Sequence, residues 1–234
     1  MHLSITQVDN LTYMKKVNLA TLQELKAISN ILHSVLMIYP EAELLNKFKE
    51  QKLAQNWPRL TLSKREVQGL GELSKFLINW NDTYDELIKL KLDYGSIFYG
   101  PETPKATPWG STYLSPSQLL NDSSTIELKK FYAKHGINIK AESNEPVDHI
   151  GLFMAIINFL LGKIIENPDI DDYRLVLTDL LEIHLLPWGK RCLTLAVENA
   201  DTDYYKGFSK LAMEFLDYLT EYFNLQVKIR SIYR

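Results

Sequence analysis

The sequence predicts an all-α protein: a single compact domain of roughly ten helices over residues 1–234. Nearly every long segment carries apolar residues spaced three and four positions apart, the pattern of one buried helical face. No segment alternates apolar and polar residues convincingly enough for a strand, and residues 226–229 come nearest to an exception. Apolar residues make up 46% and charged residues 24%, the balance of a globular protein with a substantial core.

The first half of the chain predicts four helices. The apolar face of the first is formed by Leu22, Leu25, Ile28, Leu32, Val35 and Leu36. It should end at Tyr39, because the residue before a proline rarely stays helical. A second helix is expected over about 41–56. The spacing of Ser63 and Glu66 fits a capping box and predicts a helix that continues to about Asn79. Another is expected to open at Asp82.

The pattern then stops in "YGPETPKATPWGSTYLSPSQ", residues 99–118. This stretch holds four of the nine prolines, two glycines and no helical periodicity. Irregular loops of about twenty residues are uncommon inside a compact domain and tend to be functional. This loop carries Trp109 and Tyr113, large apolar side chains on a segment that should lie at the surface. The alternative is that these aromatic side chains fold back onto the core.

Helical patterns resume at Ser124, where Glu127 again has capping-box spacing. That helix should end near Gly136. After the motif "NEPVDHIG" a strongly apolar helix is expected as far as Asn167, with Pro146 in its first helical position. Three further helices complete the fold, and their bounds are expected near 171–184, before Asn199 and over 204–219.

Composition excludes several function classes. The formal net charge is −3 with both signs dispersed, which argues against nucleic-acid binding. Cys192 is the only cysteine, so no intrachain disulfide can form, and its apolar surroundings predict a small core residue. The N-terminal stretch does not have the pattern of a signal peptide. The most apolar run is interrupted by Lys163 and is shorter than a membrane span, so we expect a cytoplasmic protein with at most peripheral membrane contact.

The adjacent Asp148 and His149 allow three interpretations. They are a metal-binding pair, as in helical phosphohydrolases, with His135 and His184 as further internal candidates; or polar residues that cap a helix; or part of a binding site. A metal-dependent phosphohydrolase therefore stays open as the alternative function. The chain has no Gly-x-Ser-x-Gly nucleophile elbow and no phosphate-binding loop, so no cofactor and no conventional nucleotide-dependent activity are expected.

Four stretches together resemble one protein family: "LDYGSIFYGP", "PWGSTYLS", "NEPVDHIG" and "HLLPWGKR". In order and spacing they are similar to the TorD/DmsD family of redox-enzyme maturation chaperones, most of all to its DmsD branch. The likeness extends from about Leu90 to the C-terminus. Two departures are mild and bear on partner preference: Gly95 stands where a larger residue is expected, and Tyr113 stands where a tryptophan is also seen.

The resemblance implies an all-helical, non-enzymatic protein of the cytoplasm. It implies binding to the twin-arginine signal peptide, or leader, of a molybdenum-cofactor enzyme until the cofactor is loaded and before export by the Tat translocase. Dimethyl sulfoxide reductase is the expected client, and the chaperone is expected to act as a monomer. Weak guanine-nucleotide binding, a property of some relatives, has no phosphate loop to support it here. The implied leader-binding residues are Tyr94, Phe98, Trp109, Gly110, Ser111, Tyr113, Glu145, Pro146, Asp148, His149, His184 and Trp188.

These residue types suit an arginine-containing apolar peptide. Carboxylates form charge-assisted, bidentate bonds with guanidinium groups and so favour arginine over lysine. We expect Glu145 and Asp148, three residues apart, to lie on one helical face. His149 is expected to orient Asp148 by a hydrogen bond or to sense pH near neutrality. Aromatic side chains would supply most of the binding energy in a groove for the apolar part of the leader.

Overall fold

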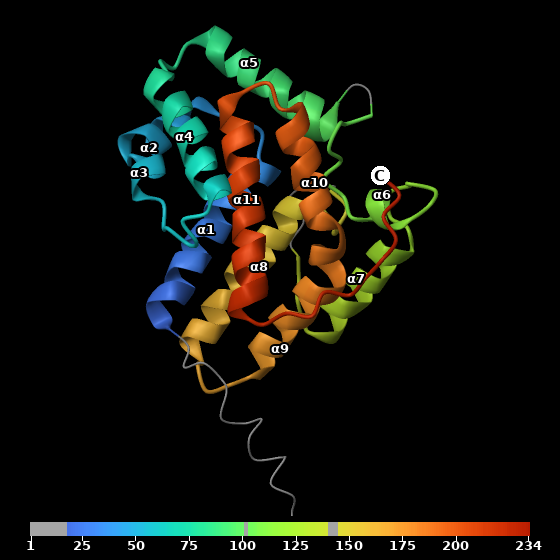
Figure 1. The fold of residues 1–234 in the computed structure, drawn as a ribbon. Helices are drawn as coiled ribbons and strands as arrows, with labels where there is room; N and C mark the ends of the chain where they lie inside the picture. Colours follow the sequence, from blue (N-terminus) through green and yellow to red (C-terminus); the bar gives the residue numbers. More distant parts are fainter. Residues whose placement is uncertain (1–17, 101–102, 140–144) are drawn as a thin grey trace, which may run out of the picture.

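The computed structural model describes residues 18–100, 103–139 and 145–234. The N-terminal stretch, Pro101 and Asn144 lie outside these residues. The described residues form α-helices with two short π-helical segments, so the predicted all-α class is confirmed (Figure 1). In chain order the elements are α1 (Leu19–Met37), α2 (Ala42–Glu50), α3 (Leu53–Asn56), α4 (Lys64–Asn79), α5 (Tyr84–Tyr94), η2 (Gly95–Tyr99), α6 (Ser111–Leu114), α7 (Ser123–Lys134), α8 (Ile150–Glu166), α9 (Asp172–Asp179), η3 (Leu180–Leu185), α10 (Leu186–Asn199) and α11 (Asp203–Tyr222).

The candidate strand at residues 226–229 is wrong. These residues belong to an extended C-terminal segment that passes η3, α10 and α7 and ends beside α6 (Figure 1). Within the described parts of the chain, the one isolated β-type bridge joins Trp109 to His149. None of the helices described is long and apolar enough to cross a membrane.

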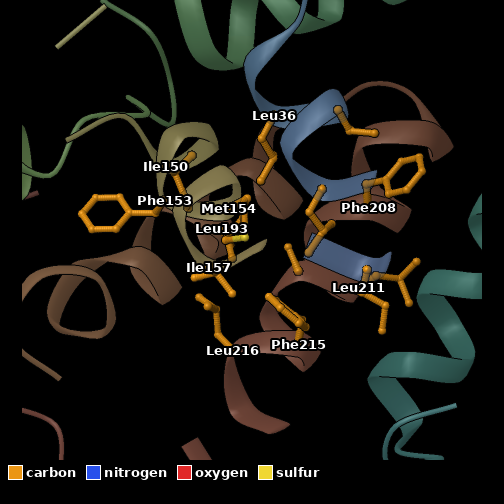
Figure 2. Packing of buried hydrophobic residues seen from close by; sticks show 14 of the residues in the cluster. Leu36, Ile150, Phe153, Met154, Ile157, Leu193, Phe208, Leu211, Phe215 and Leu216 are labelled. Carbon is orange, nitrogen blue, oxygen red and sulfur yellow. The ribbon is translucent and has the colours of Figure 1, made fainter. Parts of the chain in front are cut away.

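The core lies where α11 packs between α4 and α10 and where α1 packs along α8 (Figure 1). Apolar side chains from these helices interlock in one continuous cluster (Figure 2). Burial of each such side chain is worth about 1.5–3 kcal/mol relative to exposure. The labelled members of the cluster are Leu36, Ile150, Phe153, Met154, Ile157, Leu193, Phe208, Leu211, Phe215 and Leu216.

Cys192 is a fully buried member of this core, as predicted. Its thiol donates a hydrogen bond to the Thr107 carbonyl at 3.4 Å. Burial raises the pKa of Cys192 to about 12, so the thiol stays protonated at neutral pH. The contact attaches the long loop to α10.

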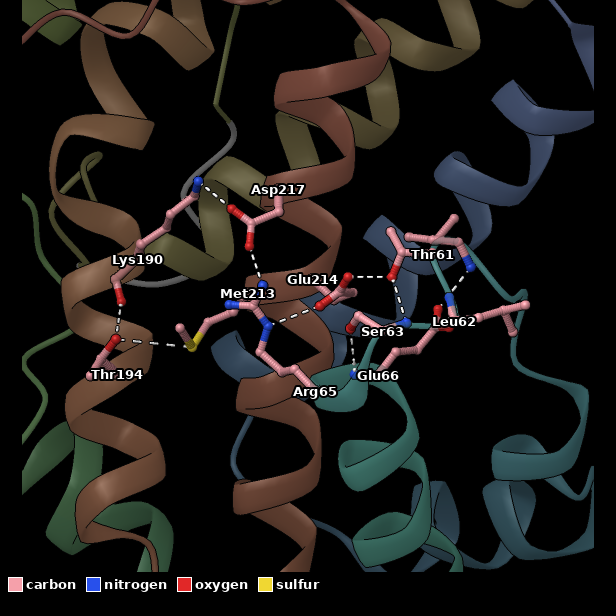
Figure 3. Close-up of polar contacts among 11 residues, drawn as sticks. Thr61, Leu62, Ser63, Arg65, Glu66, Lys190, Thr194, Met213, Glu214 and Asp217 are labelled. Atoms are coloured by element: carbon pink, nitrogen blue, oxygen red, sulfur yellow. Dashed lines mark hydrogen bonds and ion pairs between the residues drawn. The ribbon is translucent and has the colours of Figure 1, made fainter.

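A charged network joins α4, α10 and α11 at the surface of the core (Figure 3). The guanidinium of Arg65 pairs with Glu214 at 2.8 Å and also with Asp217, which in turn pairs with Lys190. Close to this network, α4 and α11 approach at two glycines: a Cβ on Gly207 would lie 2.8 Å from the Gly69 carbonyl oxygen. Small residues and paired charges therefore fix the helices that support the site.

The structure differs in detail at two predicted helix starts, in the capping box of α4 and in the first residue of α7. Ser63 caps α4, but the carboxylate of Glu66 accepts hydrogen bonds from Leu60 and Leu62 and does not close a capping box. The helix predicted from Ser124 begins one residue earlier and is capped by Asp122, whose side chain accepts from Ser123. Glu127 is thereby free to make the contact with the C-terminal segment described below.

Candidate functional site

The long loop is attached to the start of α8 by backbone hydrogen bonds. The amide of Gly110 donates to the Asp148 carbonyl at 3.1 Å, and the amide of Ile150 donates to the Pro108 carbonyl at 2.7 Å. His149 is the N-cap of α8, and its Nδ1 accepts from the Gly151 amide at 3.0 Å. The structure therefore brings "PWGSTYLS" and "NEPVDHIG" together.

The expected start of α8 was wrong. Pro146 and Glu145 precede the helix, which begins at Ile150, so neither they nor Asp148 occupy its first turn. Because residues 145–149 are not helical, Glu145 and Asp148 do not share a helical face. Glu145 is half-buried, whereas Asp148 is only 3% exposed.

Asp148 is an internal anchor. Its Oδ2 accepts hydrogen bonds from the Ser111 amide at 2.7 Å and from the Thr125 hydroxyl at 3.0 Å. One carboxylate oxygen thus connects α6, α7 and the residues before α8. The other oxygen, Oδ1, is buried and has no hydrogen-bond partner among the residues described.

His149 has a structural role that the sequence motif only partly indicated. It is 1% exposed, and burial, aided by the nearby His33, lowers the pKa of His149 to about 3. Its Nδ1 accepts from the Gly151 amide, and the hydrogen bonds of the described residues include none between His149 and Asp148, so the expected bond is not formed. With a pKa this low, His149 stays neutral at physiological pH and does not titrate near neutrality. Of the three interpretations, helix capping is therefore correct for His149, which caps α8.

Glu145 presents its carboxylate at the surface between two aromatic side chains. Its Oε1 accepts from the Tyr99 hydroxyl at 2.6 Å, and its Oε2 accepts from Nε1 of Trp109 at 3.0 Å. The two rings lie 6.5 Å apart between centroids. The hydrogen bond to Glu145 raises the pKa of Tyr99. We call Tyr99, Trp109 and Glu145 the surface cluster.

Tyr99 was not among the residues expected in the site. It ends η2 and is 54% exposed. Only the stretch "IFYGP" indicated a residue of interest here, and the π-helical turn that aims Tyr99 at Glu145 has no recognisable sequence signature.

Four of the aromatic residues expected to contact the leader are buried in the core: Tyr94, Phe98, Tyr113 and Trp188. Tyr94 and Phe98 pack against Tyr205, with ring centroids 5.8 and 6.0 Å from it. Tyr113 is fully buried and stacks on Trp188 at 5.4 Å. The expectation that Tyr113 lies at the surface is therefore wrong, and the alternative of folding back onto the core is correct for it.

Gly110 is required by the same packing. A Cβ at this position would lie 2.7 Å from Nε1 of Trp188, closer than real side chains approach. Trp188 donates from Nε1 to the His184 carbonyl at 2.7 Å. The half-buried ring of His184 lies 4.9 Å from that of Phe131, and burial lowers the pKa of His184 to about 4.

A narrow cleft lies behind the loop and gathers four of the expected residues. We call it the inner cleft. Its lining comprises Gly110, Leu114, Ser124, Glu127, Leu128, Asp148, Ile183, His184, Trp188 and Arg230. Across the described ranges, no three His, Cys, Asp or Glu side chains gather closely enough to hold a metal ion. The arrangement gives no support to the phosphohydrolase alternative.

Comparison with known proteins identifies the family. Residues 63–194 match the model of the nitrate reductase delta subunit family, more than half of the chain. The chain belongs to this family, which includes the TorD/DmsD redox-enzyme maturation chaperones. These are chaperones rather than enzymes, and the predictions of family and of a non-enzymatic protein are confirmed.

Named relatives agree with the family. The probable Tat proofreading chaperone DmsD of Haemophilus influenzae is 24% identical over 218 residues, 92% of this chain and 98% of that protein. The chaperone protein TorD of Aliivibrio salmonicida is 25% identical, over 74% of this chain and 94% of that protein. The Tat proofreading chaperone DmsD of Salmonella typhimurium is 28% identical, over 59% of this chain and 64% of that protein.

Proposed function

We propose that this chaperone binds the twin-arginine leader of a molybdenum-cofactor oxidoreductase precursor in the cytoplasm. It holds the precursor until the cofactor is loaded and before export by the Tat translocase. The catalytic subunit of dimethyl sulfoxide reductase is the proposed client. The whole chain acts as one monomeric unit, without a cofactor of its own or a nucleic-acid partner, and with at most peripheral membrane contact.

The observation that carries the proposal is the position of Glu145. Its carboxylate is half-buried between Tyr99 and Trp109, each of which donates one hydrogen bond to it. A carboxylate has about four lone-pair sites, so two acceptor positions remain for a guanidinium. The aromatic rings beside it add stacking surface, which arginine uses better than lysine.

The apolar part of the leader needs a separate surface, because Tyr94, Phe98, Tyr113 and Trp188 are buried. A cavity of about 330 Å³ beside α8 supplies one. Its lining includes Phe159, which is 49% exposed. His33 in this lining contacts the Gly151 carbonyl at 2.8 Å, close to the cap of α8. We place the apolar segment of the leader here. The other apolar lining residues are Ile137, Ile139, Leu152, Ala155 and Ile156.

Calorimetric titration with leader peptides tests the function. Binding at micromolar Kd or tighter that weakens sharply when both arginines become lysine supports it. A panel of leaders from dimethyl sulfoxide, trimethylamine-oxide, formate and nitrate enzymes tests the client. Preference for another leader changes the client only, whereas no binding to any leader rejects the function.

The variant Phe159→Glu tests the proposed apolar surface. It should weaken binding of the arginine leader without changing the ratio between the arginine and lysine peptides. Tyr84→Glu is the control, since Tyr84 is also a highly exposed aromatic residue, on α5. If Phe159→Glu and the native protein bind the arginine leader with equal affinity, the cavity beside α8 is not the binding surface for the apolar part of the leader.

A further inference from the structure

The C-terminal segment Leu225–Arg234, which we call the strap, crosses the elements that build the candidate site. The Lys228 amide donates to the Glu182 carbonyl in η3 at 3.0 Å. The Tyr233 amide donates to the Tyr113 carbonyl in α6 at 2.9 Å. The side chain of Arg234 donates to the Pro104 carbonyl in the loop. The strap therefore contacts η3, α6 and the loop, which all contribute residues to the lining of the inner cleft.

The strap buries little apolar surface. Leu225 is its one buried side chain, whereas Ile229 is 97% exposed. Segments that bury little apolar surface and whose hydrogen bonds are mostly exposed to solvent open at low free-energy cost compared with the core. The strap can therefore leave its position while the helices stay folded.

Arg230 of the strap lies in the lining of the inner cleft. Its guanidinium pairs with Oε2 of Glu127 at 2.8 Å. The side chain of Glu127 is 52% exposed, and ion pairs exposed to solvent contribute little stability. This contact positions a guanidinium at the cleft without holding it firmly.

Two buried polar atoms in the same lining have no partner among the residues described. One is Oδ1 of Asp148, an acceptor, and the other is Nε of Arg230, a donor. Asp148 is 3% exposed, so its unpaired oxygen is shielded from solvent, and the residue belongs to the lining of the cleft. Unpaired buried polar atoms are costly, and a guanidinium donor would satisfy this carboxylate best.

The sequence of the strap has the chemistry of the proposed ligand. "VKIRSIYR" combines basic and apolar residues, as does a leader with arginines followed by an apolar segment. We propose that the inner cleft is a guanidinium-binding site lined by Glu127 and Asp148. In the free protein Arg230 pairs with Glu127 alone, and a leader arginine that displaces the strap takes its place and also pairs with Asp148. This inference rests on the proposed function.

The test compares leader binding by the native protein, Arg230→Gln and a control. Lys228→Gln is the matched control, because it removes one positive charge from an exposed strap residue without touching the Glu127 pair. Loss of a competing exposed ion pair should tighten binding of the arginine leader by about two- to fivefold in Arg230→Gln. Lys228→Gln should stay near native affinity.

Amide hydrogen exchange on the native protein gives a second readout that needs no variant. Saturation with the leader should speed exchange at Lys228 and Tyr233, whose amides hold the strap. Unchanged or weaker leader binding in Arg230→Gln, or unchanged exchange at both amides in a protein that binds the leader, overturns the inference and leaves the function standing. If no protein in the set binds any leader, the proposed function fails and this inference fails with it.

Discussion

Nε1 of Trp109 donates to Oε2 of Glu145 at 3.0 Å, across 36 residues of sequence. This bond joins the aromatic loop to the acidic motif at the surface of the protein. Tyr99 completes the arrangement from the end of η2. The surface cluster is therefore the part of these motifs that is exposed in the free protein, while Asp148 and His149 lie buried behind it.

Trp109→Ala should weaken leader binding by about 1–3 kcal/mol, the usual scale of an interface hot spot. Trp109→Phe keeps an aromatic ring but loses the N–H donor to Glu145, so it should lose less. Calorimetry on both variants measures the difference, with circular dichroism to check folding. Native affinity in folded Trp109→Ala would contradict a role for this residue in binding.

Asp148→Ala should act first on stability. It leaves the Ser111 amide and the Thr125 hydroxyl without their shared acceptor, at a cost of about 1–3 kcal/mol for each buried group left unpaired. Denaturant unfolding measures this loss. We expect leader binding to weaken as well, by about 1–3 kcal/mol. Unfolding free energy equal to that of the native protein would show that Asp148 is not an anchor.

Gly110→Ala and Gly71→Ala form a matched pair of glycine substitutions. A Cβ at Gly110 meets Trp188 at 2.7 Å, so overpacking should destabilise the protein by about 1–3 kcal/mol. A Cβ at Gly71 in α4 has nothing within 4 Å, and alanine there should stabilise by up to about 1 kcal/mol. Thermal melts of the two variants should shift in opposite directions. Shifts of the same sign would contradict the packing of Gly110.

Acid should destabilise the protein through His149. The pKa of His149 is about 3 in the folded state and about 6.5 in the unfolded state. Between these two pH values the unfolded chain binds a proton at His149 and the folded chain does not. The stability from neutral His149 is present above pH 6.5 and is lost as pH falls toward 3. His149→Asn keeps a good N-cap residue and removes the titration. Unfolding free energies measured over this range should fall less steeply in the variant; equal slopes would contradict the assignment.

The sequence predicted what depends on local pattern. The buried face of α1 consists of the apolar positions read from the three-and-four spacing, and the core position of Cys192 followed from its apolar neighbours. The family resemblance predicted that the aromatic loop and the acidic motif belong to one site, and the hydrogen bond between Trp109 and Glu145 shows that these two segments are in contact. These features need only helical periodicity or motif order.

Other features depend on contacts distant in sequence. Ser124 looked like a cap, but Asp122 takes that role and Glu127 pairs with Arg230, 103 residues away. The burial of Asp148 depends on α6 and α7 folding over it, which no spacing near Asp148 indicates. Tyr99 enters the surface cluster through a π-helical turn, and sequence patterns do not distinguish such a turn from continued α-helix.

The central claim is that Glu145 recognises a leader arginine, and a four-way calorimetric cycle tests it most directly. It combines native protein and Glu145→Gln with an arginine leader and its lysine counterpart. Glu50→Gln, which changes an exposed carboxylate at the end of α2, is the control protein. The account predicts that the preference for arginine over lysine is large in the native and Glu50→Gln proteins and clearly reduced in Glu145→Gln. An undiminished preference in folded Glu145→Gln would contradict it.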